Sequence, residues 1–490
     1  MNMKSLFPLI LVFLVFSCSK DEELSLPKTV DPLPSANVPV QDFMWKAMNF
    51  WYFWQSDVKD LADDRFTDSE SYTAFLQSED DPGAFFDSKL LYIQDRFSFY
   101  NSDYRELTNS LAGISRSNGL EFGLVRKTNS EEVFGYVRYI IPNSDAATKD
   151  IERGDLFTGV NGITLTINNY VDLLFGDNNT YVLNMADFSN GDVIQNDREV
   201  SLIKEEALAE NPIFISKSFE INGITIGYLM YNQFTNEYDD DLYEAILGLK
   251  NLGITELIVD LRYNPGGSVN TTRALASMIY DTNTDNLFLK KRYNDKIQDQ
   301  LTESQLEVYF TNRVGSNTIE PLGLNKLYVL TTASSASASE LLINSLEPYI
   351  DVIQIGDVTR GKNEFSTTLV DDRENSYLYT PTRVNKIKSN NQWAIQPLLG
   401  RNENADGFYE YTDGLVPDIP LKEDYGNLGI LGDLNEPLLA RAIQEITGAT
   451  GKRSFSVENP IEILSSSKMF GPFKDKMIDD TVYDMELSLD

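Results

Sequence analysis

The chain has 490 residues, 42% of them hydrophobic, which is enough for the cores of about three domains of ordinary size. Its formal net charge of −34 excludes nucleic acid as a partner, because phosphates require a basic surface, and disfavours electrostatic docking on an anionic membrane. The chain contains no histidine, which excludes a Ser-His-Asp or Cys-His catalytic site. Its single cysteine excludes an internal disulfide and a cysteine metal cluster. We therefore expect no metal and no cofactor.

Residues 1–17 combine a lysine with an apolar run too short to span a bilayer, which predicts a secretory signal. Cys18 follows directly and resembles the acylated cysteine of bacterial lipoproteins; the alternative is a plain signal with an incidental cysteine. The resemblance implies export and attachment to the outer membrane through a lipid at Cys18, facing the periplasm or the cell surface. Residues 18–38 are polar and proline-bearing, which predicts a tether without packed structure.

Residues 39–107 are rich in aromatic side chains at helical spacing, most densely between Phe43 and Trp54. Further helical patterns cover residues 72–76 and 84–91. Aromatic residues at this spacing usually form a core rather than a ligand site. We therefore predict a small helical domain.

Residues 108–205 consist of short β-like segments, at 121–125, 133–141 and 156–160. A PDZ domain is resembled by four stretches, Leu120–Leu124, Ala146–Ile151, Gly154-Asp155-Leu156 and Val160-Asn161-Gly162, the last of which fits a hairpin turn in either case. In such domains the amides of the first loop hold a peptide carboxylate while the peptide adds a strand to the sheet edge. The resemblance places that loop at Phe122, Gly123 and Leu124 and implies partners that are polypeptides with free C-termini; the alternative is an edge strand in a purely structural domain.

Residues 206–450 alternate strand and helix patterns, which predicts an α/β core with a parallel sheet covered on both faces. The predicted strands are 224–230, 256–261, 327–330 and 352–355, and the predicted helices are 239–249, 269–280, 340–350 and 437–446. Right-handed β-α-β crossovers bring the loops after successive strands to one edge of the sheet, where ligands collect. Ser337 and Lys362 lie in two of these loops, so we expect them to share a crevice. Residues 451–490 form an acidic tail without a clear pattern.

In a chain without histidine, lysine is the natural base for a serine nucleophile, because burial can depress the pKa of its amine. Ser337 precedes a predicted helix, whose free amides, Ala338 first, favour a developing negative charge. A structural explanation is also open, since Ser337-Ala-Ser-Glu340 is a capping box, Lys362 alone is an ordinary lysine, and Pro265-Gly266-Gly267 is a tight turn.

Three motifs occur together: Asp260-Leu-Arg-Tyr-Asn-Pro-Gly-Gly267, Ser337-Ala-Ser-Glu340 and Gly361-Lys362. They resemble the signature of the carboxyl-terminal-processing, or tail-specific, serine peptidases. The resemblance implies a ClpP/crotonase-like core, Ser337 as nucleophile and Lys362, 25 residues later, as base. It further implies an oxyanion hole formed by Gly266 or Gly267 together with Ala338.

The family often places a glutamine four residues after the lysine, where this chain has Ser366. Asn363, Glu364 and Ser366 are the alternatives for the residue that orients the lysine. The chain is thus predicted to be a multidomain α+β and α/β serine endopeptidase that acts on exported proteins through a Ser-Lys dyad and an acyl-enzyme. Two alternative hypotheses remain. The chain is an inactive peptide-binding lipoprotein that acts as a scaffold or sensor, or it is a hydrolase of non-peptide acyl bonds.

Overall fold

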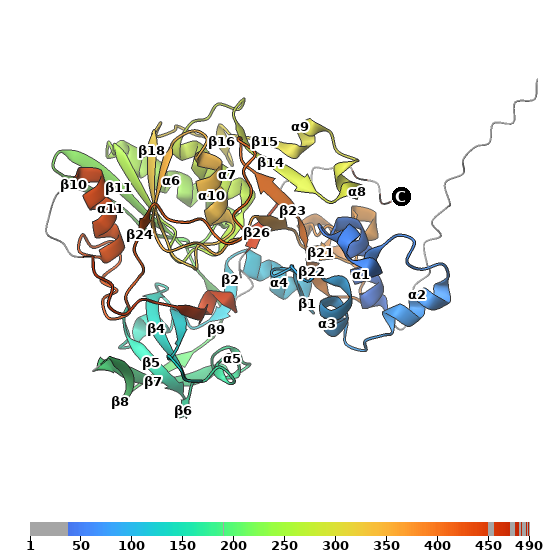
Figure 1. Ribbon diagram of the computed structural model, residues 1–490, viewed down its shortest axis with the longest axis horizontal. Coiled ribbons are helices and arrows are strands. Elements are labelled where there is room, and N and C mark those ends of the chain that lie inside the picture. Colours follow the sequence, from blue (N-terminus) through green and yellow to red (C-terminus); the bar gives the residue numbers. More distant parts are fainter. Residues whose placement is uncertain are drawn as a thin grey trace, which may run out of the picture.

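The computed structural model describes residues 38–189, 191–448, 455–470, 476–479, 482, 487 and 489. The chain forms a helical region, a β unit and a larger α/β core, which lie against one another (Figure 1). The predicted signal, the tether and Cys18 lie outside the described residues, except for Val38. Among the described residues, none of the helices combines the length and the apolar character needed to cross a bilayer.

The helical region comprises α1 (Pro39–Trp51), α2 (Ser69–Leu76), α3 (Pro82–Phe85) and α4 (Tyr104–Leu111). The aromatic face of α1 is buried, as predicted, but in the same hydrophobic cluster as the α/β core. Across that boundary, Trp51 Nε1 donates a hydrogen bond to Ser376 O at 2.6 Å. The helical region therefore shares the core of the larger unit.

The β unit (residues 114–209 together with β25) is built on an antiparallel sheet with its own hydrophobic cluster. Asn161 and Gly162, with φ of 52° and 79°, turn the chain from β5 to β6, which confirms the predicted hairpin. Helix α5 (Tyr170–Phe175) packs on the unit, and β2 (Ile114–Ser117) pairs with β9 (Glu205–Ala209). The sheet order is β25 (Ile463–Ser466), β3 (Leu120–Arg126), β4 (Val133–Ile140), β5 (Leu156–Val160), β7 (Thr180–Ser189) and β8 (Asp192–Ile203), with β6 (Ile163–Thr164) paired to β5.

Phe122, Gly123 and Leu124 lie inside β3, so the prediction that they form a loop is wrong. The physical reason is that β3 has a strand on each side. It pairs with β4 on one side and with β25, from the acidic tail, on the other. The sheet edge expected to receive a peptide is thus occupied by a segment of the same chain.

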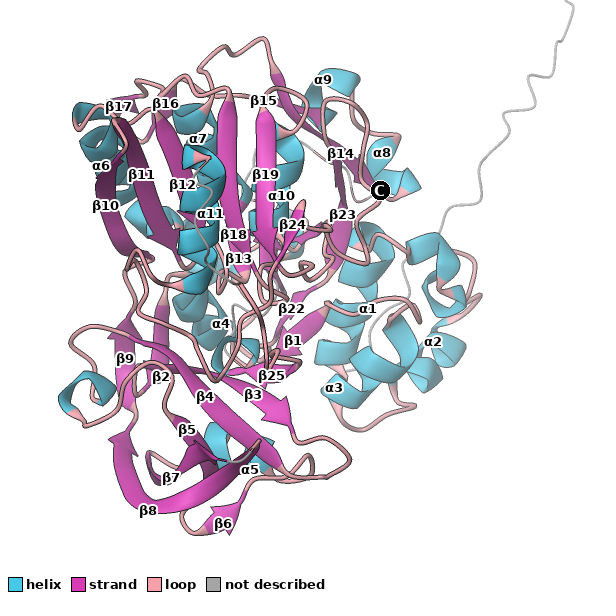
Figure 2. Cartoon of the chain, turned by 60° about the vertical axis from the view of Figure 1, so that its left-hand side comes forward, coloured by secondary structure: helices cyan, strands magenta, loops and turns pink. Residues whose placement is uncertain are grey.

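The α/β core is built on a six-stranded sheet (Figure 2). One face is covered by α6 (Asp239–Asn251), α7 (Val269–Ile279) and α10 (Ala338–Leu346), and the other by α11 (Pro437–Thr447). Alternate residues of the strands point to opposite faces and pack in two separate hydrophobic clusters, one with each set of helices. The strands, in spatial order, are β10 (Ile213–Ile221), β11 (Ile224–Tyr231), β12 (Glu256–Asp260), β18 (Lys326–Thr331), β19 (Asp351–Gly356) and β24 (Ile419–Pro420).

This sheet is mixed, which corrects the prediction of a parallel sheet. From β11 to β24 all neighbours are parallel, but β10 is antiparallel to β11. A tight turn at Asn222-Gly223, with φ of 54° and 78°, joins β10 to β11 as a hairpin. A hairpin connection leaves no room for a crossover and therefore forces antiparallel pairing.

A second six-stranded sheet adjoins the core and contains another strand from the tail, β26. Its order is β13 (Gly266–Ser268), β26 (Lys476–Ile478), β20 (Glu364–Ser366), β23 (Leu398–Glu403), β14 (Leu287–Tyr293) and β15 (Glu307–Tyr309). The smaller elements are β1 (Phe99–Asn101) with β22 (Ala394–Gln396) and β21 (Leu369–Val370), β16 (Arg313–Val314) with β17 (Asn317–Thr318), α8 (Asp295–Gln298) and α9 (Glu303–Leu306).

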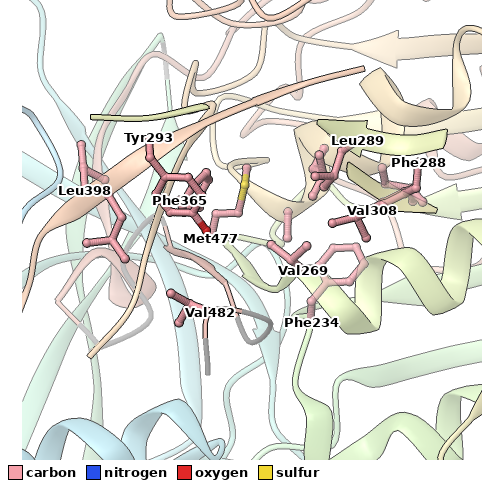
Figure 3. Close-up of a cluster of buried hydrophobic side chains, with 14 of the residues drawn as sticks. Phe234, Val269, Phe288, Leu289, Tyr293, Val308, Phe365, Leu398, Met477 and Val482 are labelled. Atoms are coloured by element: carbon pink, nitrogen blue, oxygen red, sulfur yellow. The ribbon is translucent and has the colours of Figure 1, made fainter. Parts of the chain in front are cut away.

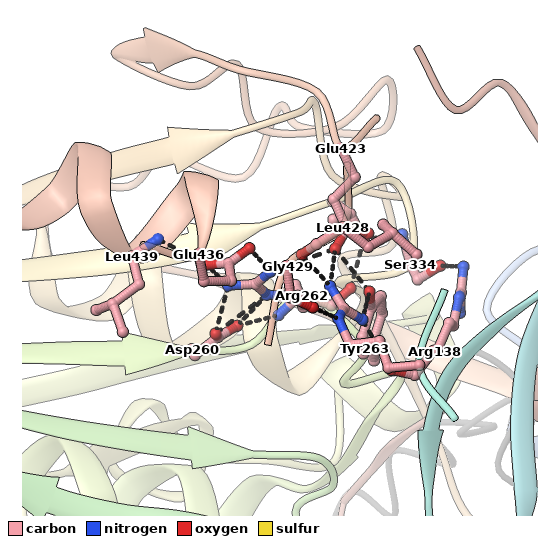
Figure 4. A network of polar contacts seen from close by, with 12 residues as sticks. Arg138, Asp260, Arg262, Tyr263, Ser334, Glu423, Leu428, Gly429, Glu436 and Leu439 are labelled. Atoms are coloured by element: carbon pink, nitrogen blue, oxygen red, sulfur yellow. Dashed lines mark hydrogen bonds and ion pairs between the residues drawn. The ribbon is translucent and has the colours of Figure 1, made fainter. Parts of the chain in front are cut away.

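A buried ionic network fixes the end of β12 (Figure 4). The Arg262 guanidinium is 0% exposed and binds Asp260 at 2.7 Å and Glu436, at the start of α11, at 2.6 Å. It also meets Glu423 at 3.2 Å, and Glu423 binds Arg153 of the β unit at 2.9 Å. The network therefore links the β unit to the loop that carries the two glycines.

Candidate active site

Three loops meet at the edge where β12, β18 and β19 end, as the sequence predicts. Hydrogen bonds hold them together: Ser335 Oγ donates to Leu261 O at 2.8 Å, and Ser339 Oγ donates to Asn264 O at 3.0 Å. The Arg360 amide of the third loop donates to Ser335 O at 3.0 Å. The loops are therefore one rigid assembly, with Ser337 in its middle.

Ser337 differs from its three neighbouring serines because its hydroxyl has no hydrogen-bond partner among the described residues. Ser335 and Ser339 donate as above, and Ser334 Oγ accepts from Arg138 of the β unit at 2.9 Å. The backbone of Ser337 is also strained, with φ of 62° and ψ of −109°, a conformation that residues other than glycine rarely adopt. A strained, buried and unbonded hydroxyl is the arrangement expected for a nucleophile rather than for a structural serine.

The capping explanation accounts for only half of this geometry. Glu340 accepts a hydrogen bond from the Ser337 amide at 2.7 Å, as in a capping box. The Ser337 hydroxyl faces the Glu340 amide in the reciprocal position, but this pair does not reach hydrogen-bond geometry. The hydroxyl therefore stays available for chemistry.

Lys362 lies beside Ser337 because both backbone amides bind one oxygen of Glu340. The backbone amides of Ser337 and Lys362 both donate to Glu340 Oε2, at 2.7 and 2.9 Å. Sharing one acceptor atom keeps these two backbone nitrogens close together. The Lys362 side chain is 1% exposed, and its Nζ lies 5.1 Å from the centre of the Phe97 ring. The structure thus brings the backbones of the predicted pair together and buries both side chains.

The sequence indicated Glu340 only as the last residue of a capping box, and the structure adds a second role for its carboxylate. Its second oxygen accepts from the Gly361 amide at 2.6 Å and from the Thr359 hydroxyl at 2.5 Å. Burial raises the pKa of Glu340 to about 7, while these donors act in the opposite direction. The S-x-x-E pattern marks this residue, but only the fold shows that it joins both loops.

The structure narrows the predicted choice of oxyanion donor from Gly266 or Gly267 to Gly267. The Gly266 amide already donates to Asn264 Oδ1 at 2.9 Å, which removes Gly266 from the predicted pair. Gly266 O and the Ser268 amide both bond to the backbone of Phe234, so the Gly267 amide points to the opposite side of the strand, where β26 pairs with β13. Ala338, at the first position of α10, has an amide without an intrahelical acceptor.

Each alternative for the residue that orients Lys362 has another partner. Asn363 Nδ2 donates to Tyr409 O, and Glu364 binds Arg401 at 3.1 Å. Ser366 Oγ accepts from Gln396 at 3.1 Å and donates to Met477 O at 3.3 Å. The buried Gln396, from β22, was not predicted, since no local pattern connects it with Ser366.

A cavity of about 900 Å³ lies between the helical region, the β unit and the core. It extends from Phe97, whose ring lies under the Lys362 amine, to Phe122 and Phe175 of the β unit. Ser337 and Lys362 are not among its lining residues. The cavity therefore connects the β3 edge with the neighbourhood of the lysine but stops short of the nucleophile.

Two family models match the chain, Peptidase family S41 over residues 225–397 and Peptidase S41 N-terminal domain over residues 39–99. The chain is 25% identical over 267 residues to a carboxyl-terminal-processing protease of Picosynechococcus sp., covering 53% of this chain and 57% of that protein. It is 24% identical over 238 residues to the carboxy-terminal processing protease CtpB of Bacillus subtilis, covering 48% and 42%. The chain spans about half the length of the curated relatives that it matches.

Solved structures show the same fold. A putative S41 protease from Bacteroides fragilis aligns with a TM-score of 0.63 at 24% identity, covering 83% of this chain and 97% of that one. The photosystem II D1 C-terminal processing protease aligns with a TM-score of 0.50 at 20% identity, with the same coverage of both chains. The molecule is thus a multidomain α+β protein with an N-terminal helical region, mixed sheets and an S41-like peptidase fold.

Proposed function

The chain belongs to peptidase family S41, whose members use a Ser-Lys dyad, and from this premise we propose that it is a serine endopeptidase that processes the C-terminal regions of exported proteins. The observation that carries the proposal is the shared Glu340 oxygen, which holds Ser337 and Lys362 next to each other.

The proposed reaction proceeds through an acyl-enzyme. Lys362, as a neutral amine, takes the proton of Ser337 as the hydroxyl oxygen attacks the carbonyl carbon of the peptide bond. The amides of Gly267 and Ala338 stabilise the oxyanion, and Lys362 then gives the proton to the leaving amine. In the second half, Lys362 activates the water that hydrolyses the ester and restores Ser337.

The β unit is proposed to recruit polypeptides by strand addition at the β3 edge, through their free C-termini. Support comes from β25, which occupies this edge in the same manner, and from the cavity that runs from Phe122 towards Phe97. A recruited polypeptide would lie in this cavity and extend beyond Phe97 towards the catalytic loops.

The test is cleavage of an unfolded polypeptide by purified Ser337→Ala and Lys362→Ala variants. We expect each to lose activity by on the order of 10³-fold or more, because the two residues act as one unit. Ser345→Ala is the matched control, since Ser345 is a buried serine in the same helix and should leave activity unchanged. Cleavage that persists without the Ser337 hydroxyl would refute the assignment.

A non-catalytic peptide-binding role is the second candidate, and the burial of the site favours it, because Ser337 is 0% exposed. In that case the wild-type chain binds peptides but neither cleaves them nor reacts with a serine-acylating probe. Comparing ester with peptide substrates tests the further possibility that the chain hydrolyses a non-peptide acyl bond.

We also propose export and lipid attachment at Cys18, supported by the sequence of residues 1–18 alone. Growth with labelled palmitate should label the wild-type protein and leave a Cys18→Ser variant unlabelled. Attachment to the outer membrane should be lost in the same variant.

A further inference from the structure

The tail segment, defined as residues 463–469 and 476–479, adds one strand to each of two different sheets. Its first part forms β25 on the β unit, and its second part forms β26 in the sheet beside the catalytic loops. Neither strand is required to complete the six-stranded sheet of the core.

β26 lies between the two strands that carry the catalytic backbone. On one side it pairs in parallel with β13, where Gly267 faces Met477, and on the other it pairs with β20, where Ser366 faces Ile478. β13 holds the oxyanion glycine, and β20 begins two residues after Lys362. Without β26, the edges of β13 and β20 would face each other across a gap one strand wide.

Met477 anchors β26 through an apolar side chain that is 0% exposed. Figure 3 shows it between Phe365 on one side and Val269 and Phe234 on the other. Asn402 Nδ2 contributes a hydrogen bond to its sulfur at 2.8 Å. The side chains around Met477 form a pocket for an apolar side chain.

Asp479 anchors β26 through its carboxylate. Lys291 Nζ donates to both oxygens, at 2.8 and 2.7 Å, and the Tyr293 hydroxyl donates to one of them at 3.0 Å. Lys291 is 1% exposed and Asp479 is 0% exposed, so the cation and the carboxylate are both taken out of water. A buried ammonium group requires an opposite charge, which makes this position selective for a carboxylate.

The first part of the tail segment lies on the β unit as a recruited peptide would. β25 is antiparallel to β3, and Ser467 Oγ accepts from the Phe122 amide at 3.0 Å. Next along the chain, Phe470 stacks on Phe175 of α5, with 4.0 Å between ring centres. Strand addition beside a helix is the mode by which such β units bind peptides.

We propose that substrate polypeptides bind between β13 and β20 as an added strand, with an apolar side chain in the Met477 position and a side-chain carboxylate two residues later on Lys291 and Tyr293. The tail segment occupies this groove in cis and inhibits the enzyme until it is displaced. This inference rests on the proposed peptidase function.

The binding test uses the full chain with Ser337→Ala, so that no cleavage is needed, and with Cys18→Ser, Ser366→Cys and Ile478→Cys. Ser366 and Ile478 face each other across β20 and β26, so a disulfide there holds β26 in place, and reduction frees it. The probe is a fluorescent peptide of residues 474–482, KDKMIDDTV. We expect the reduced chain to bind it at least tenfold more tightly than the oxidised chain.

An Asp479→Asn substitution in the reduced chain weakens the anchor of the tail and should improve peptide binding about tenfold further. Peptides with asparagine in place of the first of the two adjacent aspartates, or serine in place of methionine, should bind at least tenfold more weakly. Lys291→Met should abolish the discrimination between the aspartate and asparagine peptides, a readout that a merely structural lysine would not change.

With Ser337 restored, the reduced Asp479→Asn chain should cleave an unfolded polypeptide about tenfold faster than the oxidised chain. Peptide binding without cleavage would refute the peptidase function and leave the groove intact. Equal peptide binding by the oxidised and reduced chains, or no binding to the reduced Asp479→Asn chain, would overturn the proposal.

Discussion

At Glu340, one buried carboxylate accepts hydrogen bonds from three backbone amides, those of Ser337, Gly361 and Lys362, and from the Thr359 hydroxyl. Its position is decided by donors on two loops that are distant in sequence. A change confined to this side chain should therefore disturb the nucleophile and the base together.

Glu340→Gln should lower kcat/KM by 10²-fold or more. The glutamine side chain has only one acceptor oxygen, and its NH2 group would face backbone amides that also donate, so the hydrogen bonds to one of the two loops would be lost. An unsatisfied buried donor costs about 1–3 kcal/mol, so the melting temperature should also fall. Glu347→Gln, on an exposed carboxylate at the end of the same helix, is the control and should change neither quantity. Full activity of the Glu340→Gln enzyme would contradict the bridging role.

The raised pKa of Glu340, about 7, predicts that activity and stability respond to pH in opposite directions. Activity should fall as pH drops below about 7, because the protonated carboxyl no longer accepts all its donors. Since the pKa is higher in the folded than in the unfolded chain, folding takes up a proton between about pH 4.5 and 7, and the contribution of this group to stability decreases as pH rises through that window. Melting temperatures of wild-type and Glu340→Gln proteins across this range check the sign: the slope should be steeper in the wild type.

Among the elements, the short strand β13 shows how a backbone requirement selects a residue. A Cβ atom on Gly267 would lie 2.0 Å from Phe234 O, and φ there is +137°, a conformation that only glycine adopts readily. The two hydrogen bonds between β13 and Phe234 leave the backbone no room to retreat.

Gly267→Ala should therefore abolish cleavage and destabilise the fold by roughly 1–3 kcal/mol. Gly248→Ala is the matched control, because a Cβ there meets nothing within 4 Å and the position is helical, where alanine stabilises by about 0.5–1 kcal/mol. Chemical denaturation with an activity assay separates the two. An active and fully stable Gly267→Ala enzyme would contradict the requirement for glycine at this position.

For the whole molecule, the ionic network around Arg262 decides how the β unit is held against the core. Arg153 and Glu423 meet in the network, and Glu423 and Glu436 both bind Arg262. Removing one member leaves an uncompensated buried charge, which costs more than the loss of a surface pair.

Glu436→Gln should lower the free energy of unfolding by about 3–5 kcal/mol. Arg441→Ala, which removes an exposed pair with Glu445 on the same helix, should cost no more than about 0.5 kcal/mol. Arg153→Met should make the β unit unfold before the core, giving two transitions in calorimetry. A single unchanged transition in the Arg153→Met protein would show that the network does not couple the two parts.

The sequence by itself determined four strands of the core sheet, β11, β12, β18 and β19, the four helices that cover it, and the edge at which the loops of Ser337 and Lys362 meet. These follow from local periodicity and from the handedness of β-α-β crossovers, which need no knowledge of distant partners. The motif Asp260–Gly267 likewise indicated the turn after β12, and its oxyanion role stays a prediction.

Only the tertiary structure decided that Gly266 is engaged by Asn264, that Glu340 joins both catalytic loops, and that the tail forms β25 and β26. Strands of three or four residues carry too little periodicity to be recognised, and their stability comes from partners hundreds of residues away. The shared core of the helical region has the same origin, since the pattern of α1 specifies a buried face but not the surface that covers it.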